Sequence, residues 1–150
     1  MARRVTGRGG GMPAGPQFVL DAQPLSLLAD DDPRMAALIE VARRESFAPA
    51  VSTVTLAEVR RTGKAESRLR WLRSRLVIVP ATEEIADLAA GLLESTGLDG
   101  HECVVDALVV ATASRAAGPV KVASSDGSHV PKLCAAASLE RASPVQWVRV

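Results

Sequence analysis

Short apolar runs alternate along the chain with longer stretches in which apolar residues recur every three or four positions. The short runs are typical of buried strands, which we expect at 18–20, 47–51, 76–79, 120–123 and 145–150. The periodic stretches predict helices at 24–29, 34–45, 52–61, 66–75, 82–96, 100–117 and 130–137. Strands that alternate with helices predict an α/β fold in which a parallel sheet carries helices on both faces.

The chain divides into a tail and one domain. Residues 1–16 are rich in Gly, Pro and Arg and lack apolar periodicity, which predicts a flexible N-terminal tail. A chain of 150 residues, 47% of them hydrophobic, is long enough for one domain with its own core. We therefore expect a single domain over residues 17–150.

Composition excludes several classes of protein. Aromatic residues make up only 3% of the chain, which argues against stacking platforms for single-stranded bases. No stretch approaches the about 18 apolar residues of a membrane span, and no apolar segment follows the basic N-terminus as in a signal peptide. We expect a cytoplasmic protein without membrane contact. Cys103 and Cys134 have no CxxC partner and are predicted to be reduced thiols in the core.

Charge is distributed unevenly although the net charge is only +1. Residues 59–75 hold seven basic residues and one acidic residue, whereas residues 82–106 hold seven acidic residues and no Lys or Arg. A basic segment beside an acidic one can hold a polyanion close to a carboxylate-bound cation. The alternative is that both segments are solvated helix faces, and Trp71 among the bases then packs or contacts a partner.

Four carboxylates stand at informative positions. Asp21 and Asp126 each follow a predicted strand, Asp106 interrupts an apolar helix, and Glu58 lies near the start of another. Strand carboxyl ends in a parallel sheet face a ligand crevice, and a buried carboxylate needs a compensating partner. Converging carboxylates form the hard oxygen site that Mg²⁺ prefers. The alternatives are structural: Asp21 caps a helix, Asp126 belongs to an ordinary turn, and the helix dipole favours Glu58.

Three further polar residues are weaker candidates. Glu102 precedes Asp106 by one helical turn and is predicted to be a solvated residue at a helix start rather than an extra ligand. His101 and His129 are predicted to be surface or capping residues, because hydrolysis by a metal-activated water needs no histidine base.

The four carboxylates lie in segments that resemble the PIN-domain family, and within it the VapC-type toxins of toxin–antitoxin pairs. The matching segments are Phe18–Ala22, Thr53–Val59, Val105–Ala113 and Ala123–Asp126, and they occur in the family's order. The resemblance covers about residues 17–150. Gln23-Pro24 and Gly127-Ser128-His129 depart from the family's usual pattern.

The resemblance implies a three-layer α/β/α fold with a central parallel sheet of four or five strands. It implies an Mg²⁺- or Mn²⁺-dependent ribonuclease in which Asp21 and Asp106 are the principal metal ligands. Glu58 and Asp126 would complete the acidic cluster, and Ser124 would hydrogen-bond it. A homodimer and a cognate antitoxin, whose tail covers the groove, are also implied.

Our interpretation of the sequence is a metal-dependent endoribonuclease that acts as the toxin of such a pair. Two alternatives stay open: a PIN-domain nuclease of RNA processing without a toxin role, and a non-catalytic interaction module.

Overall fold

A five-stranded parallel sheet forms the centre of the molecule. The structure, a computed structural model, describes residues 12–59 and 62–150, so the predicted tail lies outside the described residues up to residue 11. The strands are β1 (Gln17–Leu20), β2 (Ala48–Ser52), β3 (Val77–Val79), β4 (Val120–Ser124) and β5 (Val145–Arg149). They are all parallel and lie in the order β3-β2-β1-β4-β5. The predicted α/β fold and strand number are confirmed.

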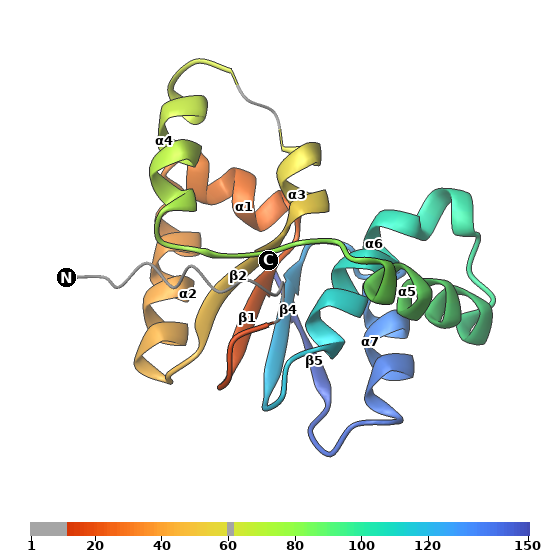
Figure 1. The fold of residues 1–150 in the computed structure, drawn as a ribbon. Coiled ribbons are helices and arrows are strands. Elements are labelled where there is room, and N and C mark those ends of the chain that lie inside the picture. The colour runs from red at the N-terminus through yellow and green to blue at the C-terminus, as the bar shows by residue number, and fades with distance from the viewer. Residues whose placement is uncertain (1–11, 60–61) are drawn as a thin grey trace.

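The helices cover both faces of this sheet. In the described part of the chain they are α1 (Ala22–Ala29), α2 (Pro33–Arg44), α3 (Thr53–Glu58), α4 (Lys64–Arg73), α5 (Glu83–Thr96), α6 (Gly100–Ser114) and α7 (Val130–Ser138). Figure 1 shows α1, α2 and α4 on one side of the sheet and α5, α6 and α7 on the other. None of the described helices is long and apolar enough to cross a membrane.

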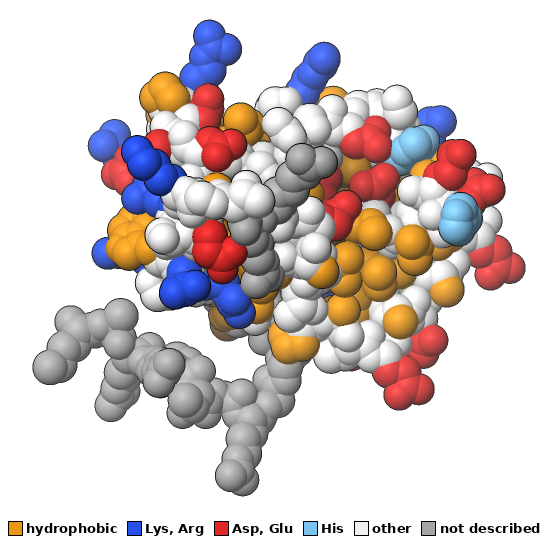
Figure 2. All heavy atoms as spheres, turned by 90° about the horizontal axis from the view of Figure 1, so that it is seen from above, with side chains coloured by type: hydrophobic (Ala, Val, Ile, Leu, Met, Phe, Trp, Pro, Cys, Tyr) orange, Lys and Arg blue, Asp and Glu red, His pale blue; other side chains and the backbone are white. Residues whose placement is uncertain are grey.

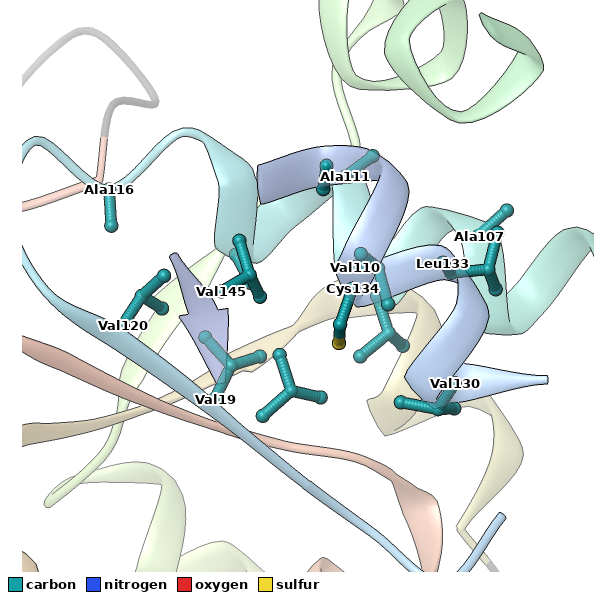
Figure 3. Close-up of a cluster of buried hydrophobic side chains, with 14 of the residues drawn as sticks. Val19, Ala107, Val110, Ala111, Ala116, Val120, Val130, Leu133, Cys134 and Val145 are labelled. Atoms are coloured by element: carbon teal, nitrogen blue, oxygen red, sulfur yellow. The ribbon is translucent and has the colours of Figure 1, made fainter. Parts of the chain in front are cut away.

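The central strand β1 supplies both layers of the core. Its side chains alternate between the two faces, as successive residues of a strand must. Phe18 and Leu20 pack with α1, α2 and α4, whereas Val19 packs with α5, α6 and α7. Figure 3 shows the part of the core on the side of α5, α6 and α7, in which Val19 lies among aliphatic side chains of α6 and α7. The first strand is therefore buried on both faces, which holds its carboxyl end firmly in place.

The helix expected at 52–61 differs from the sequence prediction at its C-terminal end. The helix expected through Arg61 ends at Glu58, because Val59 takes an extended backbone conformation; residues 60–61 lie outside the described part of the chain. Gly63, at φ +59°, precedes α4 and does not end α3. Ser52 caps α3, since its Oγ accepts a hydrogen bond from Val54 N at 3.2 Å.

The first helix begins at Ala22, directly after the first strand. Pro24 lies in the first turn of α1, where a residue has no intrahelical acceptor for a backbone N–H, so the proline does not interrupt the helix. The Gln23-Pro24 departure from the family pattern therefore leaves the strand-to-helix turn intact.

Arg141 stabilises the segment that follows α6. Its Nη1 donates to the carbonyls of Ser114 at 2.6 Å and Ala116 at 2.7 Å. Its Nη2 donates to Gly118 O at 2.8 Å, and its Nε donates to Ser143 O at 3.0 Å. The last carbonyls of a helix have no partner within the helix and attract cations. One guanidinium thus holds the end of α6 and the loops before β4 and β5.

We predict that Arg141→Lys lowers the free energy of unfolding by about 2 kcal/mol, because one ammonium cannot replace a fork that bonds four carbonyls. Urea unfolding of the purified protein measures this loss. Arg149→Lys, at an exposed position of β5, is the matched control and is expected to change stability by less than about 0.5 kcal/mol. Equal losses in both variants would contradict the anchoring role.

Candidate metal centre

The strand order brings two predicted site residues into contact. Strands β2 and β3 lie on one side of β1, and strands β4 and β5 lie on the other, so the strand order has its switch point between β1 and β4. In parallel α/β sheets, ligands bind at such a switch point, at the carboxyl ends of the strands. Leu20 pairs with Ala123 in the register of β1 and β4, so Asp21 and Ser124 come next to each other. Ser124 Oγ donates to Asp21 Oδ2 at 2.7 Å. Asp21 also caps α1, since its Oδ1 accepts from Ala22 N at 2.8 Å.

Asp21 therefore caps a helix and also bonds the neighbouring strand. The side chain is a helix cap, as the structural alternative required, and only 8% of the residue is exposed. The bond from Ser124 holds the second carboxylate oxygen, Oδ2, in place.

Asp126 is held by the turn after β4. Its Oδ1 accepts hydrogen bonds from Ser128 N at 2.7 Å and from His129 N at 2.9 Å. Its own N–H donates to Ser124 Oγ at 3.1 Å, and its Oδ2 lies 3.1 Å from His129 Nδ1. Partial burial acts to raise the pKa of Asp126, but the two amides and the His129 ring outweigh burial and hold that pKa below its ordinary value.

Asp106 comes from α6 and lies near the other acids. Its Oδ2 lies 3.8 Å from His129 Nδ1, and 21% of its side chain is exposed. Burial first, then the charges of Asp21 and Asp126, and to a smaller extent the charge of Glu58 together raise the pKa of Asp106 to about 6. His129 opposes the shift. The charges of the other three acids therefore all act on Asp106, and His129 offsets them only in part.

Glu58 occupies a different place from the one predicted. It is the last residue of α3 and not a residue near the start of a longer helix. The helix dipole disfavours an acid at this end, so the dipole cannot explain Glu58. Partial burial and then the charge of Asp21 raise the pKa of Glu58, which links this side chain to the cluster.

The four sequence-predicted residues come from four different elements, and the charges of Asp21, Glu58 and Asp126 all act on Asp106. We call Asp21, Glu58, Asp106 and Asp126 the carboxylate cluster. Figure 2 looks down on the molecule from above the view of Figure 1 and shows acidic side chains gathered beside a histidine on this face. Oxygen donors from several carboxylates match the preference of Mg²⁺ and Mn²⁺, and a divalent cation would balance their repulsion.

His129 is the residue that the sequence analysis underestimated. It precedes α7, as a capping residue would, but its side chain makes no cap hydrogen bond there. The ring instead lies between Asp126 and Asp106. The signal available in the sequence was the spacing of Asp126 and His129, three residues apart at the start of a predicted helix.

The other two weaker candidates, Glu102 and His101, lie at the exposed start of α6. Glu102 is exposed in the first turn of α6, and its backbone N–H donates a hydrogen bond to Oδ1 of the N-cap residue Asp99 at 3.1 Å. His101 is also exposed there. Both residues match the solvated helix start that was predicted for them.

The basic stretch forms part of an exposed helix. Trp71 on α4 is 44% exposed, and the guanidinium carbons of Arg68 and Arg75 each lie 4.3 Å from its ring centroid. Arg68 also pairs with Asp31 at 2.8 Å, and Arg70 pairs with Glu66 at 3.6 Å. Some of the positive charge is therefore already neutralised within the protein. Arg60 and Arg61 lie outside the described residues.

Trp147 is partly buried against the core. Its side chain packs against the cluster of α6 and α7, and its Nε1 donates to Ser124 O at 3.2 Å.

Comparison with known proteins gives a clear result at the level of structure only. No family model and no curated protein matches the sequence. A chain in the crystal structure of VapBC2 from Rickettsia felis, bound to a DNA fragment from their promoter, matches with a TM-score of 0.60 at 14% identity. That match covers 89% of this chain and 98% of the other.

Two further structures agree with this match. FitAcB from Neisseria gonorrhoeae gives a TM-score of 0.57 at 18% identity, covering 89% of this chain and 97% of the other. DNA-bound VapBC from Salmonella typhimurium gives a TM-score of 0.58 at 14% identity, covering 90% of this chain and 98% of the other.

The molecule is a PIN-like α/β/α domain. Its fold is that of chains in VapBC and FitAcB complexes, so the resemblance to VapC-type PIN domains is confirmed in the fold.

Proposed function

We propose that this protein is a metal-dependent endoribonuclease and the toxin of a VapBC-type toxin–antitoxin pair. The observation that carries the proposal is the convergence of four carboxylates from β1–α1, α3, α6 and β4–α7 at the switch point of the sheet. A non-catalytic domain gains nothing from this arrangement, because burial and then repulsion by the neighbouring acids raise the pKa of Asp106 to about 6, which weakens the folded state at neutral pH.

The ligands of the proposed cation are the carboxylate cluster. Asp21 and Asp106 are its principal ligands, and Glu58 and Asp126 complete the set. A bound Mg²⁺ or Mn²⁺ supplies Lewis-acid activation of a water and of the scissile phosphodiester. The donor set fits such an ion, because the ligand atoms are carboxylate oxygens and their combined charge is unbalanced.

The protein's own residues prepare this site. Ser124 holds one oxygen of Asp21 in place, and the amides of Ser128 and His129 fix Asp126. Both acids therefore bind with little loss of side-chain freedom, since their orientations are set before a ligand arrives. Glu58, at the exposed end of α3, borders the RNA side of the groove in this proposal.

The proposed partners follow from the same interpretation. RNA is the substrate, and the basic residues of α4 are candidates for contact with its phosphates. The solved structures with this fold are named as VapBC and FitAcB complexes, which supports a cognate antitoxin. A homodimer in the cytoplasm completes the proposal.

A growth assay tests the toxin role. Induced expression of the wild-type chain is expected to arrest growth, whereas Asp106→Asn at the same protein level is not, and co-expression of the adjacent antitoxin restores growth. Equal growth of wild type and variant would contradict the toxin role. Cleavage of RNA in vitro without growth arrest would favour an RNA-processing nuclease.

Ser124→Ala is expected to weaken Mn²⁺ binding by about 10- to 100-fold, the usual loss when a partner that orients a metal ligand is removed. The hydroxyl donates to Asp21 Oδ2 and accepts from the backbone N–H of Asp126, so its loss removes one hydrogen bond from each of two acidic residues. Isothermal titration calorimetry measures the change. Ser125→Ala is the matched control in the neighbouring exposed position, and an equal effect there would contradict the role of Ser124.

A further inference from the structure

A sulfur and a nitrogen ligand lie beside the carboxylate cluster. Cys103 and Asp106 are three residues apart on α6 and share a face of that helix. His129 reaches the same point from the start of α7. Ligand atoms of Cys103, Asp106 and His129 all lie within 4.8 Å of one another. Thiol, carboxylate and imidazole therefore meet at one place.

Cys103 differs from the other cysteine in its surroundings. Burial alone raises the pKa of Cys134 to about 12, and Figure 3 shows its sulfur among aliphatic side chains. Cys103 is also buried, with 1% exposed. Its pKa is raised by burial first and then by the charges of the acids around it, which are Asp106, Glu102, Asp99 and Asp126. The Cys103 thiol thus borders a polar, anionic site rather than a wholly apolar core.

The three donors define a class of metal. Mg²⁺ is bound through oxygen atoms, whereas a set of sulfur, nitrogen and oxygen is typical of Zn²⁺ and related transition metals. Zinc bonds of about 2.0–2.3 Å place the ligand atoms of a tetrahedral site about 3.3–3.8 Å apart. Side-chain movements of about 1 Å would close the present arrangement to that size.

The surroundings also suit a zinc ion. The side chains of Asp106 and His129 are 21% and 35% exposed, which gives an ion a path to the buried sulfur. Asp126 Oδ2 also lies 3.1 Å from His129 Nδ1, so a further carboxylate oxygen borders the site. A water molecule then takes the fourth position.

We propose that Cys103, Asp106 and His129 bind a zinc ion at a site that shares Asp106 with the carboxylate cluster. When zinc binds, the sulfur–hydrogen bond of Cys103 breaks, the proton leaves to solvent, and the thiolate bonds the metal. Because one carboxylate serves both sites, zinc competes with Mg²⁺ for Asp106. Inhibition of RNA cleavage by zinc follows from this competition and rests on the proposed function, whereas zinc binding itself does not.

Cobalt(II) is the probe that tests the binding site, since a cobalt–thiolate bond absorbs in the near ultraviolet and tetrahedral cobalt absorbs in the visible. We expect the reduced full-length protein to bind one Co²⁺ with both signals, and Zn²⁺ to remove them. Cys103→Ser is expected to lose the thiolate absorption, and His129→Gln to weaken binding by about tenfold or more. Cys134→Ser, the matched control, is expected to keep the wild-type spectrum. Circular dichroism verifies that each variant is folded.

Cobalt binding without thiolate absorption, or thiolate absorption that persists in folded Cys103→Ser, would overturn the zinc site. In the nuclease arm, the zinc concentration for half-inhibition in Mg²⁺ is expected to rise about tenfold or more in Cys103→Ser relative to Cys134→Ser. Unchanged inhibition would overturn the competition. A protein without nuclease activity would contradict the proposed function alone, because the cobalt spectrum still decides the zinc site.

Discussion

Asp106→Asn is expected to reduce the rate of RNA cleavage by about 100- to 1,000-fold at saturating Mg²⁺ or Mn²⁺. Loss of one principal metal ligand costs several kcal/mol of transition-state stabilisation, and each 1.4 kcal/mol is about tenfold in rate. Asparagine has the shape of aspartate but lacks its charge, so the change removes the ligand with little disturbance of packing. Initial rates on a defined RNA measure the effect.

Glu102→Gln is the matched control for this prediction. Glu102 lies one turn earlier on the same helix, is exposed, and loses the same charge on substitution. The rate of RNA cleavage by Glu102→Gln is expected to stay within about twofold of the wild-type rate, a change in activation free energy of less than about 0.5 kcal/mol. A loss shared equally by both variants would point to general electrostatics of α6 rather than to a ligand at Asp106.

Asp106→Asn is also expected to stabilise the metal-free protein at pH 7.5 by up to about 3 kcal/mol. Burial and the neighbouring acids raise the pKa of Asp106 from 3.8 to about 6, so its charge opposes folding at neutral pH. Asparagine cannot ionise and avoids this penalty. Urea unfolding in EDTA measures the difference between wild type and variant, and added Mn²⁺ is expected to reduce that difference by stabilising the wild type.

The pH dependence of this difference has a defined sign. Near pH 4 the folded carboxyl is protonated, and the wild type and variant differ least. Between about pH 4 and pH 6 the unfolded chain has released this proton while the folded chain keeps it, so the wild type loses stability as pH rises. Above about pH 6.5 the gap is constant. Asp87→Asn, on an exposed position of α5, is expected to change stability by less than about 0.5 kcal/mol throughout. A gap that is constant from pH 4 to pH 7.5 would contradict the raised pKa of Asp106.

These two predictions concern one physical conflict. The site keeps charges that weaken the folded protein unless a cation is bound, and natural proteins tolerate such conflicts mainly where function requires them. A structural explanation of the carboxylate cluster therefore predicts the opposite result, a loss of stability in Asp106→Asn.

Much of this site could be predicted from the sequence, because local sequence patterns determine where its residues lie in the secondary structure. Asp21 and Asp126 follow buried apolar runs, and the end of such a run is the end of a strand. Glu58 was found as a residue but its local structure was predicted wrongly, because Ser52, Thr53 and the following residues favour a helix that the backbone at Val59 ends early. Adjacency of β1 and β4 comes from the strand order, which no local pattern encodes.

Other features depend wholly on tertiary structure. His129 and Cys103 each satisfied a local role, as a residue before a helix and as a core thiol, and only the packing of α6 against α7 brings them together. Arg141 gave no signal in the sequence, because three of its four carbonyl partners lie 23 to 27 residues earlier in the chain.

The most direct test of the central claim is cleavage of RNA by the purified chain with Mg²⁺ or Mn²⁺, with EDTA, and with Asp21→Asn. We predict discrete cuts that require the metal, disappear in EDTA, return when the metal is restored, and are absent in the variant. Cleavage that persists in EDTA, or in folded Asp21→Asn, would contradict the account. So would a folded wild-type chain that neither cuts RNA nor binds Mn²⁺ by calorimetry.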